Sequence, residues 1–195
     1  MELPKKIGDP ILLLPRSPYG GRTIVKQLFT NPKTGGIDEY YLYDSLAKPA
    51  CILPITKHGD VVTIWQFRHG ANVMLLEIPG GNHKFPGETP EQVALRELKE
   101  ETGYIPRKVI YLGRKIFMQP VSHGVAYHPF LGLDCRKITE PKHDNSEHIE
   151  VLLTPLKDWV EYCMSEQNDG ISANVTLAAF PHLGITLTYP DIIPG

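Results

Sequence analysis

The chain has 195 residues, of which 42% are hydrophobic and 22% are charged, and its formal net charge is -2. This composition is typical of a soluble globular protein and argues against a disordered chain. The near-neutral balance lacks the basic stripe that nucleic-acid binding needs, so we expect a small ligand and no nucleic-acid partner.

The three cysteines are scattered, odd in number and outside any metal-ligand spacing, which predicts no disulfide framework and fits a reducing cytoplasm. The apolar run Ile11 to Leu14 is too short for the core of a secretion signal. No stretch is long and apolar enough to span a bilayer. We therefore expect a cytoplasmic protein without a membrane partner.

The first elements along the chain predict a β hairpin. Two runs rich in β-branched and aromatic residues flank a turn-forming gap, in the order RTIVKQLF, NPKTGG, IDEYYLYDSL. We expect residues 1–48 to form an N-terminal antiparallel β extension and residues 49–195 to form the main domain.

The main domain is predicted to alternate strands and helices. The expected strands are ACILPIT, VVTIWQFR, VMLLEIP, KVIYLGRKIF, AYHPFLGLDC and IEVLLTP. The expected helices are Thr89 to Gly103, Pro155 to Ser165, with Leu156, Val160 and Cys163 at helical spacing, and Ser172 to Phe180. This alternation predicts an α+β or α/β sandwich, with helices packed on a sheet.

The first helix has clear signals at both ends. Thr89 is a capping residue, Pro90 suits the first helical position, and Gln92 stands where a capping box has Glu or Gln. Gly103 supplies the left-handed residue that commonly ends a helix. The apolar residues Ala94, Leu95 and Leu98 form the face that packs on the sheet.

Three carboxylates share another face of this helix. Glu97, Glu100 and Glu101 stand at i, i+3 and i+4, and like charges at these spacings destabilise a helix unless something offsets them. A divalent cation would do so, and carboxylate oxygens suit magnesium or manganese. A solvated acidic face with Arg96 and Lys99 as partners is the alternative, but the preceding Pro-Gly-Gly turn allows close approach of a ligand.

The segment GGNHKFPGETPEQVALRELKEETGY resembles the Nudix box, which is glycine, five residues, glutamate, seven residues, then R-E-apolar-x-E-E-x-G-apolar. The match is complete from Glu88 onward. Six residues separate Gly81 from Glu88, one more than in the family pattern, so the loop between them is expected to bulge.

The resemblance implies a Nudix-like α/β/α sandwich with a mixed sheet and a metal-dependent hydrolase that binds Mg²⁺, with Mn²⁺ as the alternative. It also implies that the metal ligands are Glu97, Glu100, Glu101 and the carbonyl of Gly80. Glu88 and Arg96 are implied as supports, because a guanidinium holds a carboxylate bidentately. A simple surface ion pair between Arg96 and Glu100 remains the alternative for the arginine.

From about Arg22 to Phe180 the chain is similar in outline to the ADP-ribose pyrophosphatase branch of this family. This likeness implies substrate contacts at Arg68, Glu77, Gly81 and Pro120, although the glutamate that the branch carries a few residues after the proline is missing here. It also implies a homodimer formed through the N-terminal sheet. For the general base, Glu147 is the first candidate, Asp144 the second, and Glu97 of the helix the other.

The expected reaction is hydrolysis of a nucleoside diphosphate linked to another moiety, with ADP-ribose giving AMP and ribose 5-phosphate. GDP-mannose or another nucleotide sugar is an alternative substrate. A non-catalytic nucleotide-sensing domain is a second alternative, although such domains often lose a box glutamate. A third is an isomerase acting on an isoprenoid diphosphate through a cysteine and acid pair.

Overall fold

The structure is a computed structural model that describes residues 2–15, 23–44, 48–117, 120, 125–143, 149–165 and 167–186. The chain divides into two compact units. The first comprises residues 1–47 and 117–126, and the second comprises residues 48–116 and 127–195. Each unit is described by itself.

The first unit contains an antiparallel sheet in the order β1-β2-β3, with β1 at Lys6–Leu14, β2 at Thr23–Thr30 and β3 at Ile37–Asp44. The predicted β2-β3 hairpin is confirmed, and Gly35 closes its turn with a φ of 74°. Phe29 and Tyr40 pack edge to face across it, with ring centroids 5.4 Å apart. Strand β1 was not predicted, because Gly8 and Pro10 interrupt it and it buries no residue fully.

The second unit contains a mixed sheet in the order β10-β11-β4-β5-β12, in which β4 and β11 run parallel. Short strands extend it, since β6 pairs with β5, β7 with β4, and both β8 and β9 with β11. The strands are β4 Ala50–Thr56, β5 Asp60–Arg68, β6 Val73–Glu77, β7 Gly80–Gly81, β8 Tyr104–Ile105, β9 Lys108–Tyr111, β10 Ile116–Phe117, β11 Ala126–Lys137 and β12 Ile149–Pro155.

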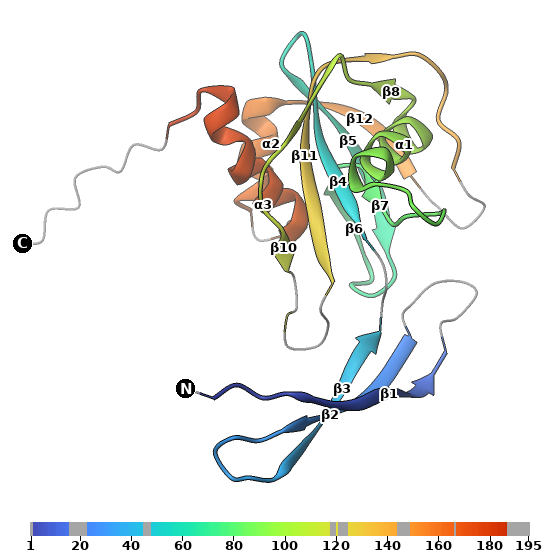
Figure 1. Cartoon of the computed structure of the whole chain (residues 1–195). Coiled ribbons are helices and arrows are strands. Elements are labelled where there is room, and N and C mark those ends of the chain that lie inside the picture. The colour runs from blue at the N-terminus through green and yellow to red at the C-terminus, as the bar shows by residue number, and fades with distance from the viewer. Residues whose placement is uncertain are drawn as a thin grey trace, which may run out of the picture. The chain divides into compact units, whose positions relative to one another are not determined.

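Helices lie on both faces of this sheet. Figure 1 shows α1 (Pro90–Thr102) on one face and α2 (Leu156–Cys163) with α3 (Gly170–Ala179) on the other. A short 3-10 helix, Phe180–Leu183, follows α3. Strand β4 is buried along its whole length, as a central strand covered on both sides should be. The predicted α/β/α sandwich with a mixed sheet is confirmed. In the described part of the chain, no helix is long and apolar enough to cross a membrane.

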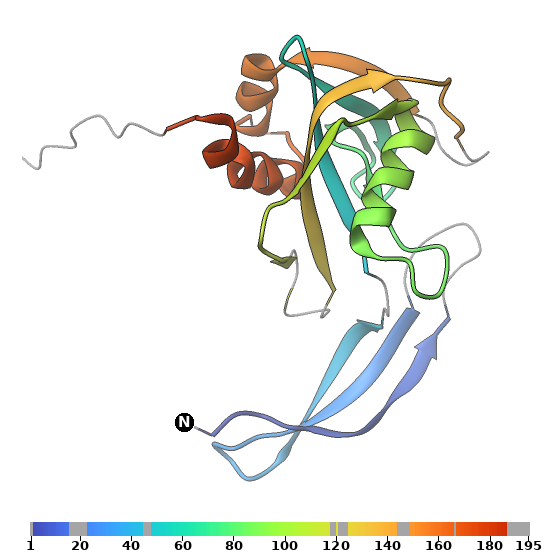
Figure 2. The ribbon, with the colours of Figure 1, turned by 45° about the horizontal axis from the view of Figure 1, so that its top comes forward.

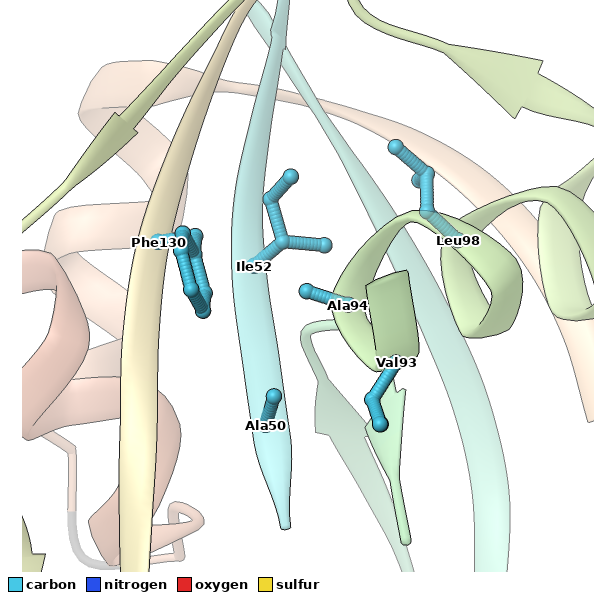
Figure 3. Packing of buried hydrophobic residues seen from close by; sticks show 6 residues of the cluster. All are labelled: Ala50, Ile52, Val93, Ala94, Leu98 and Phe130. Atoms are coloured by element: carbon cyan, nitrogen blue, oxygen red, sulfur yellow. The ribbon is translucent and has the colours of Figure 1, made fainter. Parts of the chain in front are cut away.

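Helix α1 forms as its sequence signals predict. The Thr89 hydroxyl accepts from the Gln92 backbone N–H, the Gln92 side chain accepts from the Thr89 backbone N–H, and Gly103 ends the helix with a φ of 78°. Its apolar face packs on β4 and β11 (Figure 3), where the buried side chains are Ala50, Ile52, Val93, Ala94, Leu98 and Phe130. This packing fixes the orientation of the helix on the sheet, and with it the positions of the polar side chains on its other face.

Three details differ from the predictions. The run KVIYLGRKIF is not one strand but two, β9 and β10, because Gly113 adopts a φ of 72° between them. Helix α3 begins at Gly170, two residues before the predicted start, since the Asp169 carboxylate caps it by accepting from the Ser172 backbone N–H. In α2 the fully buried residue is Trp159, whose indole N–H donates to Thr176, and the three residues noted at helical spacing, Leu156, Val160 and Cys163, are only partly buried. The C-terminal segment from residue 187 lies outside the described residues.

Candidate functional site

The polar face of α1 lies beside the two-residue strand β7. Glu101 is only 7% exposed, and its Oε2 accepts a hydrogen bond from the backbone N–H of Gly80 at 3.1 Å. Gly80 in turn pairs with Cys51 of the central strand β4. The last glutamate of the predicted cluster is therefore tied, through one backbone group, to the core of the sheet.

Arg96 is the hub of the cluster. Its Nε donates to Oε1 of Glu88 at 2.7 Å, and its Nη1 donates to Oε1 of Glu97 at 2.8 Å and to Oε2 of Glu100 at 3.0 Å. Its Nη2 reaches the carbonyl of Asn82 at 2.8 Å. The side chain is only 15% exposed, and its pair with Glu100 is one of several contacts. One guanidinium holds the loop and two glutamates together.

Gly81 leaves space for Glu97. A β-carbon on Gly81 would lie 2.3 Å from Oε1 of Glu97 and 2.5 Å from its carboxyl carbon, closer than any side chain permits. Because Gly81 carries no side chain, this carboxylate packs directly on the backbone at the end of β7. In the Gly-Gly pair that the sequence singled out, Gly81 thus leaves space for Glu97, and the backbone N–H of Gly80 donates to Glu101.

Burial and ion pairing push the carboxyl pKa values in opposite directions. Burial raises the pKa of Glu97, and Arg96 only partly offsets this. For Glu100, burial acts upward, but hydrogen bonds from Lys84 and Arg96 outweigh it and lower the pKa. The hydrogen bond from Arg96 lowers the pKa of Glu88. Within this cluster the carboxyl pKa of Glu97 is therefore shifted upward, whereas those of Glu100 and Glu88 are shifted downward.

Lys84 belongs to the cluster and was not predicted. It lies in the loop between β7 and α1, which Figure 2 shows in green next to the helix. Its Nζ donates to Oε2 of Glu100 at 2.8 Å, and this hydrogen bond is the main reason why the pKa of Lys84 is raised. A loop lysine has no fixed spacing from its partner, so no pattern in the sequence could have identified it. Next to the same helix, Nε2 of His143 lies 2.7 Å from the Glu101 carbonyl.

The predicted substrate contacts Arg68 and Glu77 bind each other. Arg68 lies at the end of β5 and Glu77 at the end of the adjacent strand β6, and Nε of Arg68 donates to Oε1 of Glu77 at 2.7 Å. The Glu77 side chain is 5% exposed whereas that of Arg68 is 46% exposed. Burial raises the pKa of Glu77, and Arg68 partly offsets this. In this pair the guanidinium is partly exposed to solvent and the carboxylate is buried. Although burial opposes it, the hydrogen bond to Glu77 and the negative charge of Glu101 favour the charged form of Arg68 and so raise its pKa.

The remaining predicted residues are Pro120, Glu147 and Asp144. Pro120 is exposed and belongs to the first compact unit. Both loop candidates for the general base, Glu147 and Asp144, lie outside the described residues. The third candidate, Glu97, is the one that the structure places, with its carboxylate between Arg96 and Gly81.

The donor chemistry of the cluster fits a hard divalent cation. Glu97, Glu100 and Glu101 offer oxygen ligands, and the Gly80 backbone lies within hydrogen-bond distance of Glu101. Within the described ranges, no three histidine, cysteine, aspartate or glutamate side chains are placed to hold one ion as they stand. One oxygen of Glu97 accepts a hydrogen bond from Arg96, and one oxygen of Glu100 accepts from both Arg96 and Lys84.

Comparison with known proteins gives a consistent result. A family model described as the NUDIX domain matches residues 46–175. An ADP-ribose pyrophosphatase of Bacillus subtilis is 32% identical over 117 residues, which are 60% of this chain and 62% of that protein. An ADP-sugar pyrophosphatase of Mus musculus is 31% identical over 121 residues, 57% of this chain and 55% of that protein. The matched part thus spans about three fifths of these relatives.

A solved structure shares the fold. The crystal structure of an ADP compounds hydrolase superposes with a TM-score of 0.74, covering 92% of this chain and 97% of that one, at 20% sequence identity. At this identity the likeness concerns the fold.

Proposed function

Because this chain belongs to the NUDIX domain family, we propose that it is a metal-dependent pyrophosphatase that hydrolyses ADP-ribose to AMP and ribose 5-phosphate. One observation carries the proposal. Two glutamates of one helix, Glu97 and Glu101, contact the Gly80–Gly81 backbone at a strand end, and a nearly buried arginine binds Glu97 and Glu100. On a solvated acidic face, the carboxylates would be exposed and would form only weak surface ion pairs.

In this proposal Glu97, Glu100, Glu101 and the Gly80 carbonyl hold Mg²⁺ or Mn²⁺. Such a cation neutralises negative charge on the diphosphate oxygens when it is bound. The chain's own task is to keep the carboxylates in place. Arg96 does so by joining Glu88 of the loop to two of them, and small displacements of such supports cost activity.

We assign Arg68, Glu77, Gly81 and Pro120 to the substrate. The half-exposed Arg68 guanidinium suits a phosphate or a ribose oxygen, and Glu77 keeps it oriented from below. Gly81 is included because its backbone lies directly beside the Glu97 carboxylate. An Arg68→Met variant should raise the KM for ADP-ribose with a smaller effect on kcat, because it loses binding rather than chemistry.

The general base is Glu147, Asp144 or Glu97, in this order of preference. A base from the loop and a metal ligand are separable by experiment, because a variant without the loop base still binds Mn²⁺ normally whereas a variant without a ligand binds it more weakly. We expect Glu147→Gln to lose most of kcat and to keep the wild-type affinity for Mn²⁺. If Glu147→Gln and Asp144→Asn are both fully active, the assignment moves to Glu97.

The activities of the similar proteins favour an adenine nucleotide as the substrate. These activities concern ADP-ribose, ADP-sugars and ADP compounds, which supports ADP-ribose over GDP-mannose. A non-catalytic sensor is less well supported, because Glu97, Glu100 and Glu101 are all present and arranged on one helix.

The decisive assay incubates the purified chain with ADP-ribose, GDP-mannose, NADH and diadenosine polyphosphates in Mg²⁺ and identifies the products. We expect AMP and ribose 5-phosphate from ADP-ribose as the main reaction. Glu101→Gln should reduce it by at least about 100-fold, as expected for loss of an ionic ligand. Glu91→Gln is the matched control, since Glu91 is exposed in the first turn of the same helix. Full activity of Glu101→Gln would reject the mechanism.

We also propose that residues 1–48 form an extension through which the chain makes a homodimer, and that residues 49–195 form the hydrolase domain. Support comes from β1, an edge strand that exposes four successive aliphatic side chains, Ile11 to Leu14, by 42% to 60%. An exposed apolar edge strand of this kind tends to pair with the same strand of a second chain. Sedimentation equilibrium should give twice the chain mass, and Leu12→Glu with Leu14→Glu should give the monomer.

A further inference from the structure

Lys84 is held at two points beside the glutamates. Its backbone N–H donates to Oε2 of Glu88 at 2.7 Å, and Glu88 is itself bound by Arg96. Its ammonium donates to Oε2 of Glu100 at 2.8 Å, the same oxygen that Nη1 of Arg96 contacts. The loop that delivers Lys84 is the one with an extra residue between Gly81 and Glu88. It therefore brings a positive charge onto a carboxylate that the proposed function assigns to the metal.

We propose that Lys84 is a resident cation that occupies Glu100, so that a divalent ion must displace its ammonium and Lys84 sets the metal affinity of the site. The inference rests on the proposed function, because it takes Glu100 to be a metal ligand. It adds a residue outside the box pattern as a determinant of that affinity.

The exposure of the two cations explains why one is displaced and the other stays. The Arg96 side chain is 15% exposed and donates to acceptors on four residues, Glu88, Glu97, Glu100 and Asn82. The Lys84 side chain is 46% exposed, and its carboxylate partner is 34% exposed. Solvent screens such a pair, so it is weak enough for a doubly charged ion to replace it. Arg96 is the fixed support, and Lys84 is the exchangeable one.

The two carboxylates differ in the cations that they contact. Glu100 directs one oxygen at two cations, and Glu97 directs one oxygen at Arg96. Removing the ammonium leaves Glu100 with a single cationic partner. It also raises the net negative charge of the cluster by one, which strengthens the attraction for a divalent ion.

The test is a Mn²⁺ titration of the full chain, with free Mn²⁺ followed by electron paramagnetic resonance. Lys84→Met should bind Mn²⁺ about three- to tenfold more tightly than the wild type, the range expected from removing one half-exposed ion pair and its charge. Lys84→Arg keeps the charge and should stay within about twofold of the wild type. Lys99→Met is the matched control, because Lys99 is exposed on the same helix and forms no ion pair among the described residues, and its affinity should also stay within about twofold.

The outcomes separate this inference from the proposed function. If the wild type binds Mn²⁺, Glu100→Gln weakens binding, and Lys84→Met binds no more tightly than the wild type, Lys84 is not a competitor and the inference is overturned alone. If Glu100→Gln leaves Mn²⁺ binding unchanged, the metal site itself is misassigned and the inference falls with it. An equal gain in Lys84→Met and Lys99→Met would overturn the specific role of Lys84, since it would reflect net charge only.

Discussion

Arg96 and Glu88 form a two-point ion pair between the helix and the loop that precedes it, with Nε to Oε1 at 2.7 Å and Nη2 to Oε2 at 3.3 Å. Both side chains are nearly buried, at 15% and 8% exposure. A planar guanidinium can make this pair and still reach Glu97 and Glu100, whereas a lysine ammonium cannot.

Arg96→Lys should therefore impair the site more than its conserved charge suggests. We expect kcat/KM and Mn²⁺ affinity to fall by about 10- to 100-fold, the usual effect of losing a group that orients ligands. The fold should persist, and circular dichroism spectra of the variant and the wild type would verify this. Lys99→Arg supplies the reciprocal control on the same helix. Activity of Arg96→Lys within twofold of the wild type would contradict the role of Arg96 as the hub.

Glu88 should make stability depend on pH in a defined direction. Its folded-state pKa lies below the ordinary value of 4.5 because of the hydrogen bond from Arg96. The pair therefore contributes stability above pH 4.5, and this contribution is lost as the pH falls through the lowered pKa. Glu88→Gln should be less stable than the wild type by roughly 1–3 kcal/mol at neutral pH, the value of a hydrogen bond to a charged group.

The measurement for Glu88 is urea unfolding of wild type and Glu88→Gln, at about pH 7 and then at decreasing pH below the ordinary carboxyl pKa. The difference in unfolding free energy should shrink as the pH falls. A constant difference would show that shape, and not the charge of Glu88, sets its contribution.

The two glycines of β7 should respond differently to a methyl group. A β-carbon on Gly80 would lie 2.7 Å from the Ala50 carbonyl, which is backbone of the central strand, so Gly80→Ala should destabilise the fold by about 1–3 kcal/mol. On Gly81 the nearest atoms belong to the Glu97 carboxylate, which can swing away. Gly81→Ala should thus keep most of the stability and lose activity and Mn²⁺ affinity. Thermal melts and assays of both variants check this, and the reverse pattern would contradict the packing.

The helix could be predicted to the residue because its signals are local. Thr89, Gln92 and Gly103 act within one turn of the residues they cap, so neighbouring letters determine both ends. The shared face of the glutamates follows from the same 3.6-residue period. The packing of helices on a sheet followed from the alternation of strand and helix patterns, and the mixed sheet followed from the resemblance to the Nudix box.

What could not be predicted depends on contacts between distant segments. Lys84 contacts Glu100 because an irregular loop folds back on the helix, and the sequence of an irregular loop has no periodic pattern from which such a contact could be predicted. Strand β1 was missed because its aliphatic residues are exposed and do not alternate with polar ones. The buried position of Trp159 depends on a partner in another helix, Thr176. The choice of the general base stays a prediction, since Glu147 and Asp144 lie outside the described residues.

The cysteines should be inert in the folded protein, which bears on the isomerase alternative. Burial raises the pKa of the Cys51 thiol far above its ordinary value, that of Cys135 to about 12 and that of Cys163 to about 11. Only the thiolate is a nucleophile, so at neutral pH each thiol should react with a disulfide reagent far more slowly in the native chain than in urea. Cys51→Ala and Cys135→Ala should retain wild-type hydrolysis of ADP-ribose, provided that their melting temperatures show an intact fold. A native thiol that reacts rapidly, with parallel loss of activity, would instead support a cysteine nucleophile.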